Sequence, residues 1–395
     1  MSLWLAVIAV IATAAAPSVL AVDATFGKPT ATAKWGEQVA FSQPAQLSGA
    51  AKRVEVLLEF PGGLGPHVVE VPPPTAGGSV TLRYSLLLAD SHIRPNSTIT
   101  TRWRITGQDG SIAVGPPVTV LYQDTRFDWK MREGALVRLH WYEGTEAFGD
   151  RALRIAETAI RETSLLLGVT EEAPIDFFVY ADGAAFREAM GPSTGEFVVG
   201  QAIAETRTLF GLIAPGQIND QLVEIVIPHE LSHLVFDTAV HNPYHFPALW
   251  LNEGLAVYLS AGYAPGDRLL VENAAKDGSL IPLGALNSFP SGERAFLAYA
   301  EGVSAVDYLV RIHGRETLVS LIKSYTAGMT DDEAFKAALG VDVAGLDAAW
   351  RKELNAREPT VHGPQPAPAG PLPPGWSDAE GSPAPSLPPG APSTG

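Results

Sequence analysis

The sequence predicts an α+β protein with a β-rich N-terminal part, a mainly helical C-terminal half and a proline-rich tail. Short runs of β-forming residues separated by turn clusters fill residues 23–125. From Asp220 to about Glu353 the pattern is mainly helical. From Pro359 onward Pro, Gly, Ala and Ser dominate. Because the chain has 395 residues, we expect two domains plus tails.

The β-rich part, residues 23–125, is predicted to be a small immunoglobulin-like sandwich. Runs such as Val54–Phe60 and Thr98–Ile105 are short and rich in β-formers. Turn clusters such as Pro61–Gly63 and Gln108–Gly110 separate the runs, and this regular spacing is typical of a sandwich. The region contains no catalytic constellation, so we interpret it as a spacer or docking module.

The two ends of the chain carry different signals. Trp4–Ala16 is an unbroken stretch of apolar and small residues, and small residues near Ala21 suit a signal-peptidase cut. Residues 1–21 are therefore predicted to be a signal peptide, although no Lys or Arg precedes the stretch. The alternative is an uncleaved N-terminal anchor. Both interpretations export the rest of the chain, as a secreted or cell-surface protein. Residues 356–395 are predicted to be a disordered, Pro-rich tail.

Composition excludes several function classes. The formal net charge is −16, which argues against nucleic acid and against anionic membrane surfaces as partners. A membrane role is expected only through an uncleaved N-terminal anchor. The chain has no cysteine, so disulfides, thiolate metal sites and a cysteine nucleophile are impossible. Any metal must be held by histidines and carboxylates.

Residues 126–219 mix strand and helix signals. A helix is expected over Ala152–Leu167, because apolar residues recur there at helical spacing and Gly168 is a natural stop. The stretch Phe197–Ile213 is expected to supply strand segments broken by Gly200 and Gly211. The other expected elements are strands at Leu136–Tyr142 and Ile175–Tyr180 and a helix around Gly183–Met190.

The clearest chemical signal is His229-Glu230-Leu231-Ser232-His233, an H-E-x-x-H sequence. Residues four apart lie on one face of a helix, so both imidazoles can reach one zinc ion. Glu230 would lie beside the metal, where it can take a proton from bound water. Pro228 is tolerated only in the first helical turn, so we expect the helix to begin near Val226 or Ile227, or to kink at Pro228.

A catalytic zinc needs a third protein ligand and one open position. Trp250-Leu251-Asn252-Glu253-Gly254 supplies the carboxylate of Glu253, and 19 residues separate it from His233. That length is enough for a turn and a second helix to return a carboxylate to the metal. Asn242–Tyr244 is expected to form the turn, and Pro247 is expected to precede the second helix.

These residues resemble the gluzincin metallopeptidases, the thermolysin-like and M1-aminopeptidase-like group with H-E-x-x-H and a downstream Asn-Glu-Gly or Asn-Glu-Ala. The bacterial peptidase MA-like family is similar in its His-Glu-Leu-Ser-His and Trp-Leu-Asn-Glu-Gly-Leu-Ala pattern and in a Tyr-Ala helix, here Tyr299–Val310, that ends at His313-Gly314. The resemblance covers roughly residues 130–350 and implies a thermolysin-like zincin domain with a small β-sheet over residues 126–355.

The resemblance implies a role for each matching residue. His229, His233 and Glu253 would bind one Zn²⁺, and Glu230 would be the general base. Tyr299 matches a tyrosine that donates to the tetrahedral oxyanion, with a half-buried helix aromatic as the equal alternative. The segment 197–210 matches an edge strand that pairs with substrate backbone. The aminopeptidase-type Gly-x-Met-x-Asn motif is missing there, so N-terminal exopeptidase specificity is not supported.

Three polar residues near the motif have ordinary alternatives. Asp237, four residues beyond His233, either orients an imidazole or is a solvated residue at the helix end, and we favour the second. His241 and His245 are interpreted as loop residues, because Glu253 already completes the ligand set.

Two function classes remain open from the sequence. The leading hypothesis is a zinc metallopeptidase that hydrolyses a peptide or protein substrate through zinc-activated water with Glu230 as base. The alternative is a non-catalytic cell-surface binding protein that retains a zincin scaffold. The intact Glu230 argues against the alternative, because a purely structural zinc site has no use for a base and tends to have four protein ligands.

Overall fold

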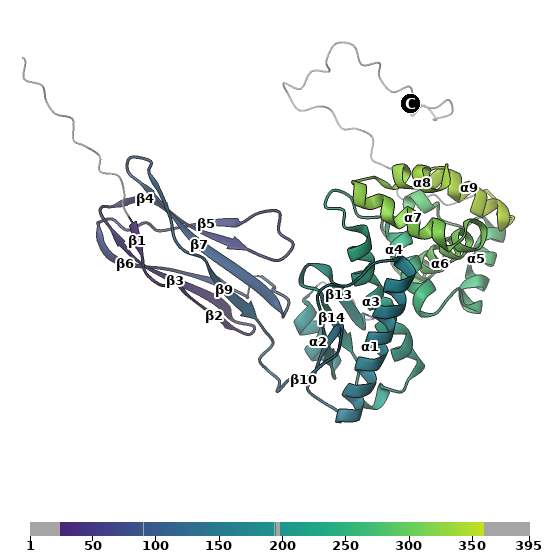
Figure 1. Cartoon of the computed structure of the whole chain (residues 1–395), viewed down its shortest axis with the longest axis horizontal. Coiled ribbons are helices and arrows are strands. Elements are labelled where there is room, and N and C mark those ends of the chain that lie inside the picture. The colour runs from purple at the N-terminus through teal and green to yellow at the C-terminus, as the bar shows by residue number, and fades with distance from the viewer. Residues whose placement is uncertain (1–23, 90, 193, 195–197, 359–395) are drawn as a thin grey trace, which may run out of the picture.

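A computed structural model of the chain describes residues 24–89, 91–192, 194 and 198–358. The predicted signal peptide or anchor and the tail from residue 359 lie outside the described residues. Within the described part, no helix has the length and apolar character needed to cross a membrane. The predicted division into a β-rich N-terminal part and a helical C-terminal half is confirmed (Figure 1).

The N-terminal part is built from two antiparallel sheets around one core. In one sheet β6 pairs along the whole of β3, and β2 and β1 pair with successive segments of the other edge of β3. In the other sheet the order is β5-β4-β7-β8, with β9 also pairing β7. Buried and less buried residues alternate along β7, and both sheets contribute to a core that includes Phe41, Val56 and Trp103. The strands are β1 (Ala24–Phe26), β2 (Thr30–Lys34), β3 (Gln38–Leu47), β4 (Ala51–Glu59), β5 (His67–Val71), β6 (Gly78–Leu87), β7 (Ser97–Gly107), β8 (Ile112–Val114) and β9 (Val118–Tyr122).

A third sheet organises the C-terminal half, in the order β10-β11-β12-β14-β13. Its central strands β11, β12 and β14 run parallel, and the edge strands β10 and β13 are antiparallel to their neighbours. The central strand β12 is buried on both faces, as its apolar run requires. The strands are β10 (Lys130–Glu133), β11 (Val137–Trp141), β12 (Ile175–Tyr180), β13 (Gly200–Ile203) and β14 (Thr208–Leu212).

Helices cover both faces of this sheet. Phe177 and Val179 of β12 point into a core shared with α1 and α3, whereas Phe178 and Tyr180 point into a second core with α2. The remaining helices form the far end of the molecule (Figure 1). The helices are α1 (Glu146–Leu167), α2 (Gly183–Met190), α3 (Gln221–Val240), α4 (Leu249–Ser260), α5 (Pro265–Asp277), α6 (Glu293–His313), α7 (Arg315–Ser324), α8 (Asp331–Leu339) and α9 (Val343–Glu353).

The expected start of the motif helix was wrong. Helix α3 begins at Gln221, and Pro228 lies inside it rather than in its first turn. Proline lacks an N–H, so the bond to the carbonyl of Glu224 is missing there. The helix continues through this gap because its apolar residues, such as Ile227 and Leu231, are buried in the core between α1 and α4. Tertiary packing therefore overrides the local signal.

The expected strand breaks at Gly200 and Gly211 were also wrong, because these glycines face each other within the β13–β14 pair. The actual break is a short 3₁₀ turn at Ala204–Thr206. Both glycines allow close approach instead. A Cβ atom on Gly211 would lie 3.0 Å from the Phe177 ring, and one on Gly200 would lie 2.5 Å from Cγ of Glu230.

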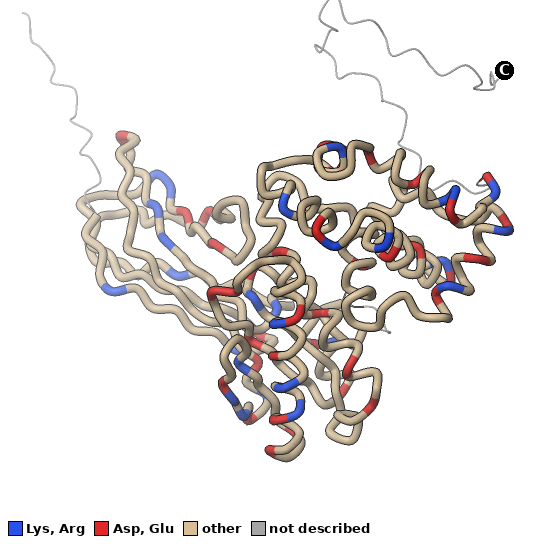
Figure 2. Tube along the Cα trace, turned by 45° about the vertical axis from the view of Figure 1, so that its right-hand side comes forward, with Lys and Arg blue, Asp and Glu red and all other residues tan. Residues whose placement is uncertain are grey.

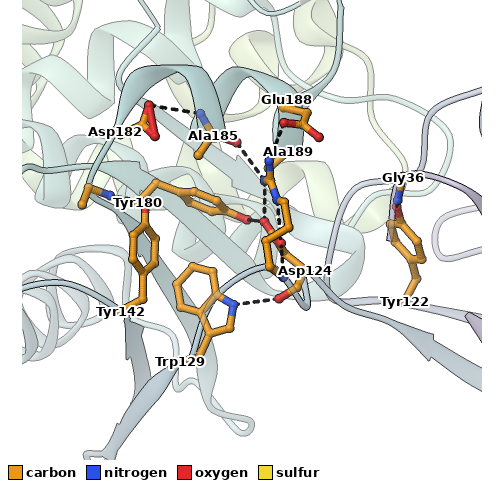
Figure 3. Close-up of polar contacts among 12 residues, drawn as sticks. Gly36, Tyr122, Asp124, Trp129, Tyr142, Tyr180, Asp182, Ala185, Glu188 and Ala189 are labelled. Carbon is orange, nitrogen blue, oxygen red and sulfur yellow. Dashed lines mark hydrogen bonds and ion pairs between the residues drawn. The ribbon is translucent and has the colours of Figure 1, made fainter. Parts of the chain in front are cut away.

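The connection between the two parts is fixed by the buried carboxylate of Asp124 (Figure 3). Tyr180 of β12 donates its hydroxyl to Asp124 at 2.9 Å, and the Trp129 indole donates to its backbone carbonyl at 2.8 Å. Arg126 donates to the same carboxylate at 2.6 Å. Arg126 also lies 4.7 Å from the ring centre of Trp35 in the N-terminal part. The linker thus ties side chains of both parts to one charged centre.

Charged residues are interspersed along both parts of the chain (Figure 2). Basic positions alternate with acidic ones along the helical end and do not gather into one basic stripe.

Candidate metal centre

Helices α3 and α4 bring His229, His233 and Glu253 together. Oε2 of Glu253 lies 3.3 Å from Nε2 of His229 and 3.7 Å from Nε2 of His233. One ligand atom from each of the three residues lies within 4.8 Å of the others. The two histidines are one helical turn apart, so their rings point to the same side of α3.

The two rings have different partners. Nδ1 of His233 lies 2.9 Å from Oδ1 of Asn252. An amide oxygen can only accept, so His233 carries its proton on Nδ1 and presents the Nε2 lone pair toward Glu253. From the sequence, Asn252 was recognised only as part of the motif around Glu253. Its contact with His233 could be identified only from the folded structure.

Glycines set the distance between α4 and the helix behind it. A Cβ atom on Gly302 of α6 would lie 2.8 Å from the carbonyl oxygen of Trp250 and 3.3 Å from Cα of Gly254. Only two glycines allow helices to approach this closely. Because Glu253 precedes Gly254 and Tyr299 lies one turn before Gly302, this crossing places the tyrosine next to the metal-ligand set.

Glu230 lies next to the three residues and packs against Gly200 of strand β13. Burial raises the pKa of its carboxyl group, and the nearby His233 and a hydrogen bond with the backbone of Ala202 oppose part of the increase. Burial also acts on Glu253, but the contacts with His229 and His233 outweigh it and lower its pKa. The pKa values of the two carboxyl groups are therefore shifted in opposite directions, which is typical of sites where one carboxyl group acts as a base and the other as a metal ligand.

The three residues fit a divalent metal ion. Oε2 of Glu253 is buried and has no hydrogen-bond partner among the described residues, although it faces two imidazole nitrogens. A buried carboxylate oxygen in that position is normally satisfied by a proton donor or a cation. Two neutral nitrogens and one carboxylate oxygen are the donors that zinc accepts in a site with one open position.

A cavity of about 860 Å³ opens over this centre. Gly200, Gln201 and Ala202 of β13 form one side of it, and Tyr299 contributes from α6. Tyr299 is 37% exposed and packs edge-on against Phe289, with ring centres 4.8 Å apart. Burial, reinforced by the negative charges of Glu253 and Glu230, raises the pKa of Tyr299 to about 12. Its hydroxyl therefore stays protonated and can donate.

The structure places the three secondary candidates as follows. Asp237 lines the cavity and is half-buried, and burial raises its pKa. Its interpretation as a solvated residue stays a prediction. His241 ends α3 in a left-handed conformation with φ of 38°. His245 lies in the following loop, where it contacts Asp331 at 3.1 Å. Glu205, also in the cavity wall, was missed because only the fold brings Ala204 and Glu205 to this cavity.

The chain was compared with known proteins. A family model described as the Peptidase MA superfamily matches residues 155–356, which is more than half of the chain. The chain belongs to the Peptidase MA superfamily. The match includes all four motif residues and Tyr299. No curated protein matches the chain.

Solved structures that this member of the Peptidase MA superfamily is similar to share little sequence identity with it. An M1 zinc metallopeptidase mutant from Deinococcus radiodurans, bound to a Tyr-Ser-Ala substrate, is 15% identical with a TM-score of 0.37, over 80% of this chain and 90% of that one. An aminopeptidase N family protein from Idiomarina loihiensis is 13% identical with a TM-score of 0.43, over 83% and 75%.

Proposed function

We propose that the protein is a zinc-dependent metallopeptidase that hydrolyses peptide bonds in a peptide or protein substrate. One observation carries the proposal: two imidazoles and a carboxylate converge at the floor of an open cavity, with Glu230 beside them. Membership of the Peptidase MA superfamily supports the reaction class. The expected export of the chain and the immunoglobulin-like character of residues 23–125, as a spacer or docking module, are part of the same proposal.

His229, His233 and Glu253 would hold the Zn²⁺ ion, and Asn252 would keep the His233 ring oriented. When bound, zinc would supply Lewis-acid activation of water and of the scissile carbonyl. The open side of the ligand set faces the cavity, so water and substrate can both reach it.

The other residues transfer protons, stabilise developing negative charge and bind the substrate backbone. Glu230 accepts a proton from the attacking water and returns it to the leaving amine. The raised pKa of its carboxyl group brings it closer to neutral pH, which suits a group that must both accept and donate. Tyr299 keeps its proton and donates to the carbonyl oxygen as negative charge develops there. The free edge of β13 pairs with the substrate backbone.

The proposal is tested by metal analysis of the purified protein together with digestion of casein, an unstructured protein, with and without a chelator. We expect about one zinc per chain and cleavage that the chelator abolishes. Zinc without cleavage of any polypeptide would favour the non-catalytic binding protein instead. Failure to bind zinc would overturn the proposal.

Three variants assign the roles. Glu230→Gln should keep the metal and lower kcat by about 10²–10⁴-fold. His229→Ala should lose most of the metal. Glu224→Gln, on the exposed side of the same helix where Glu224 pairs with Arg151, should cleave like the unmodified protein. A Glu230→Gln variant with full activity would remove Glu230 from the mechanism.

A further inference from the structure

A second cavity, of about 700 Å³, lies between the N-terminal part and the C-terminal half. Phe60, Val69 and Leu86 line it from the N-terminal sheets, and Met190 and Ile203 line it from the other side. Most of its walls are therefore apolar. Cavities of this size and character at a domain boundary are the usual location of ligand-binding sites.

The second cavity lies next to the cavity over the candidate metal centre. Glu205 lines both cavities, and β13 leads from one to the other. Gly200, at one end of β13, packs against Glu230, while Ile203, at the other end, lines the second cavity. An extended chain rises about 3.3 Å per residue, so a peptide paired with β13 would cross from metal to cavity in roughly three residues.

Direct contacts hold the two walls together. Nε2 of His92 donates to the carbonyl of Ala189 at 3.0 Å, and the Asn96 amide donates to Thr208 at 2.9 Å. These bonds join the loop before β7 to α2 and β14, next to the cavity. Together with the Asp124 cluster, they make the cavity a preformed feature of the folded chain.

Two polar side-chain atoms of the residues that line this cavity lack a hydrogen-bond partner among the described residues: Nε of Arg94 and Oγ1 of Thr206. Both atoms are buried. Arg94 forms no ion pair with an Asp or Glu among the described residues, so the part of its guanidinium group that lines the cavity can pair with a ligand carboxylate.

We propose that the second cavity is an extended subsite for the polypeptide substrate, which binds an apolar side chain roughly three residues from the scissile bond and a neighbouring carboxylate at Arg94. The proposal builds on the peptidase function proposed above. It assigns the N-terminal β part a direct role in substrate recognition, and it requires an unstructured stretch of chain as substrate, since only an extended segment can follow β13 from one cavity to the other.

The test compares a short quenched peptide of about four residues, which fits the metal cavity alone, with a longer one of about ten residues that reaches both cavities. Val69→Trp fills the second cavity. The matched control is Val68→Trp on the same strand, because Val68 is 49% exposed and points to the opposite face. We expect the ratio of kcat/KM for the long peptide to that for the short one to fall roughly tenfold in Val69→Trp.

The control should keep the ratio of the unmodified protein. An unchanged ratio in Val69→Trp, or an equal fall in Val68→Trp, would overturn the subsite. If neither peptide is cleaved, the peptidase function fails, and the subsite is then judged by binding. Anisotropy of the labelled long peptide on the Glu230→Gln protein should show roughly tenfold weaker binding once Val69→Trp is added. Equal binding would overturn the subsite.

Arg94 gives an independent readout that does not depend on how well a tryptophan is tolerated. Two long peptides differ only by Glu or Gln next to the apolar residue. The unmodified protein should prefer the Glu peptide, and Arg94→Gln should abolish that preference. Arg102→Gln, at an exposed position of β7, is the control and should retain the preference. An equal preference in the Arg94 and Arg102 variants would refute the carboxylate site.

Discussion

Gly254 and Gly302 meet backbone to backbone where α4 crosses α6, and a Cβ atom on Gly254 would lie 3.0 Å from Cα of Gly302 and closer still to its carbonyl group. The position of the Glu253 carboxylate and of the Tyr299 hydroxyl follows from this crossing. A side chain at either glycine must push the two helices apart, because backbone atoms cannot move aside as a flexible side chain can.

Gly254→Ala should therefore lower the free energy of unfolding by about 1–3 kcal/mol and reduce bound metal. Chemical denaturation and metal analysis measure the two effects. The matched control is Gly266→Ala in the first turn of α5, where a Cβ atom would meet nothing within 4 Å. Gly266→Ala should leave metal content unchanged and stability equal or slightly higher. Normal metal content in Gly254→Ala would show that the crossing does not position Glu253.

Asn252→Ala should weaken metal binding by about 10–100-fold, because the His233 ring loses the acceptor that fixes its orientation. Competition with a chromogenic chelator measures the affinity. Asn273→Ala, exposed on α5, serves as the control and should bind metal like the unmodified protein. An unchanged affinity in Asn252→Ala would mean that packing alone orients the ring.

Tyr299→Phe should lower kcat by about 10²-fold without changing bound metal, because only the donor to the developing oxyanion is removed. Tyr244→Phe, at a position that is 88% exposed in the loop after α3, is the control. If kcat is the same in both variants, Tyr299 is a helix aromatic that packs on Phe289, and the alternative raised by the sequence is correct.

Glu301 should make the protein less stable as pH rises. This carboxyl group of α6 is fully buried and accepts from the backbone N–H of Ile281, and burial raises its pKa from 4.5 to about 8. At pH values between these two pKa values, the folded protein binds more protons than the unfolded chain. The free energy of unfolding therefore falls by up to about 1.4 kcal/mol for each pH unit of increase. The loss begins near pH 4.5 and ends near pH 8.

Glu301→Gln carries no titrating group and should remove this slope. Urea unfolding at several pH values from 4.5 to 8 compares the two proteins. Identical slopes would show that Glu301 titrates normally in the fold.

The convergence of His229, His233 and Glu253 could be predicted because the sequence signals that indicate it are local. His229 and His233 need only the helical repeat, and Glu253 needs only a ligand count and a short return of the chain. Asn252 belongs to the same motif, but its partner His233 is 19 residues away, and the contact between them depends on how α4 packs on α3. Glu205 enters the cavity through strand pairing, which no local pattern reports.

Two local rules gave the wrong result for identifiable reasons. Pro228 was expected to mark a helix start, but burial of the apolar residues around it stabilises α3 on both sides. Gly200 and Gly211 were read as strand breaks, yet each is small because a side chain from another element needs the space. A single Pro or Gly in the sequence indicates which backbone conformations are allowed at that position. It does not indicate which side chains pack against the position in the folded protein.

The linker carboxylate of Asp124 has a consequence for how the molecule unfolds. It is buried, and its partners Tyr180, Arg126 and Trp129 come from the C-terminal half and the linker, while Arg126 also packs on Trp35. Melting the C-terminal half alone would remove the Tyr180 donor from the buried Asp124 carboxylate, and melting the N-terminal part alone would remove the Trp35 ring from the Arg126 guanidinium. We therefore expect both halves to unfold in one cooperative calorimetric transition, as a single thermodynamic unit despite their separate cores.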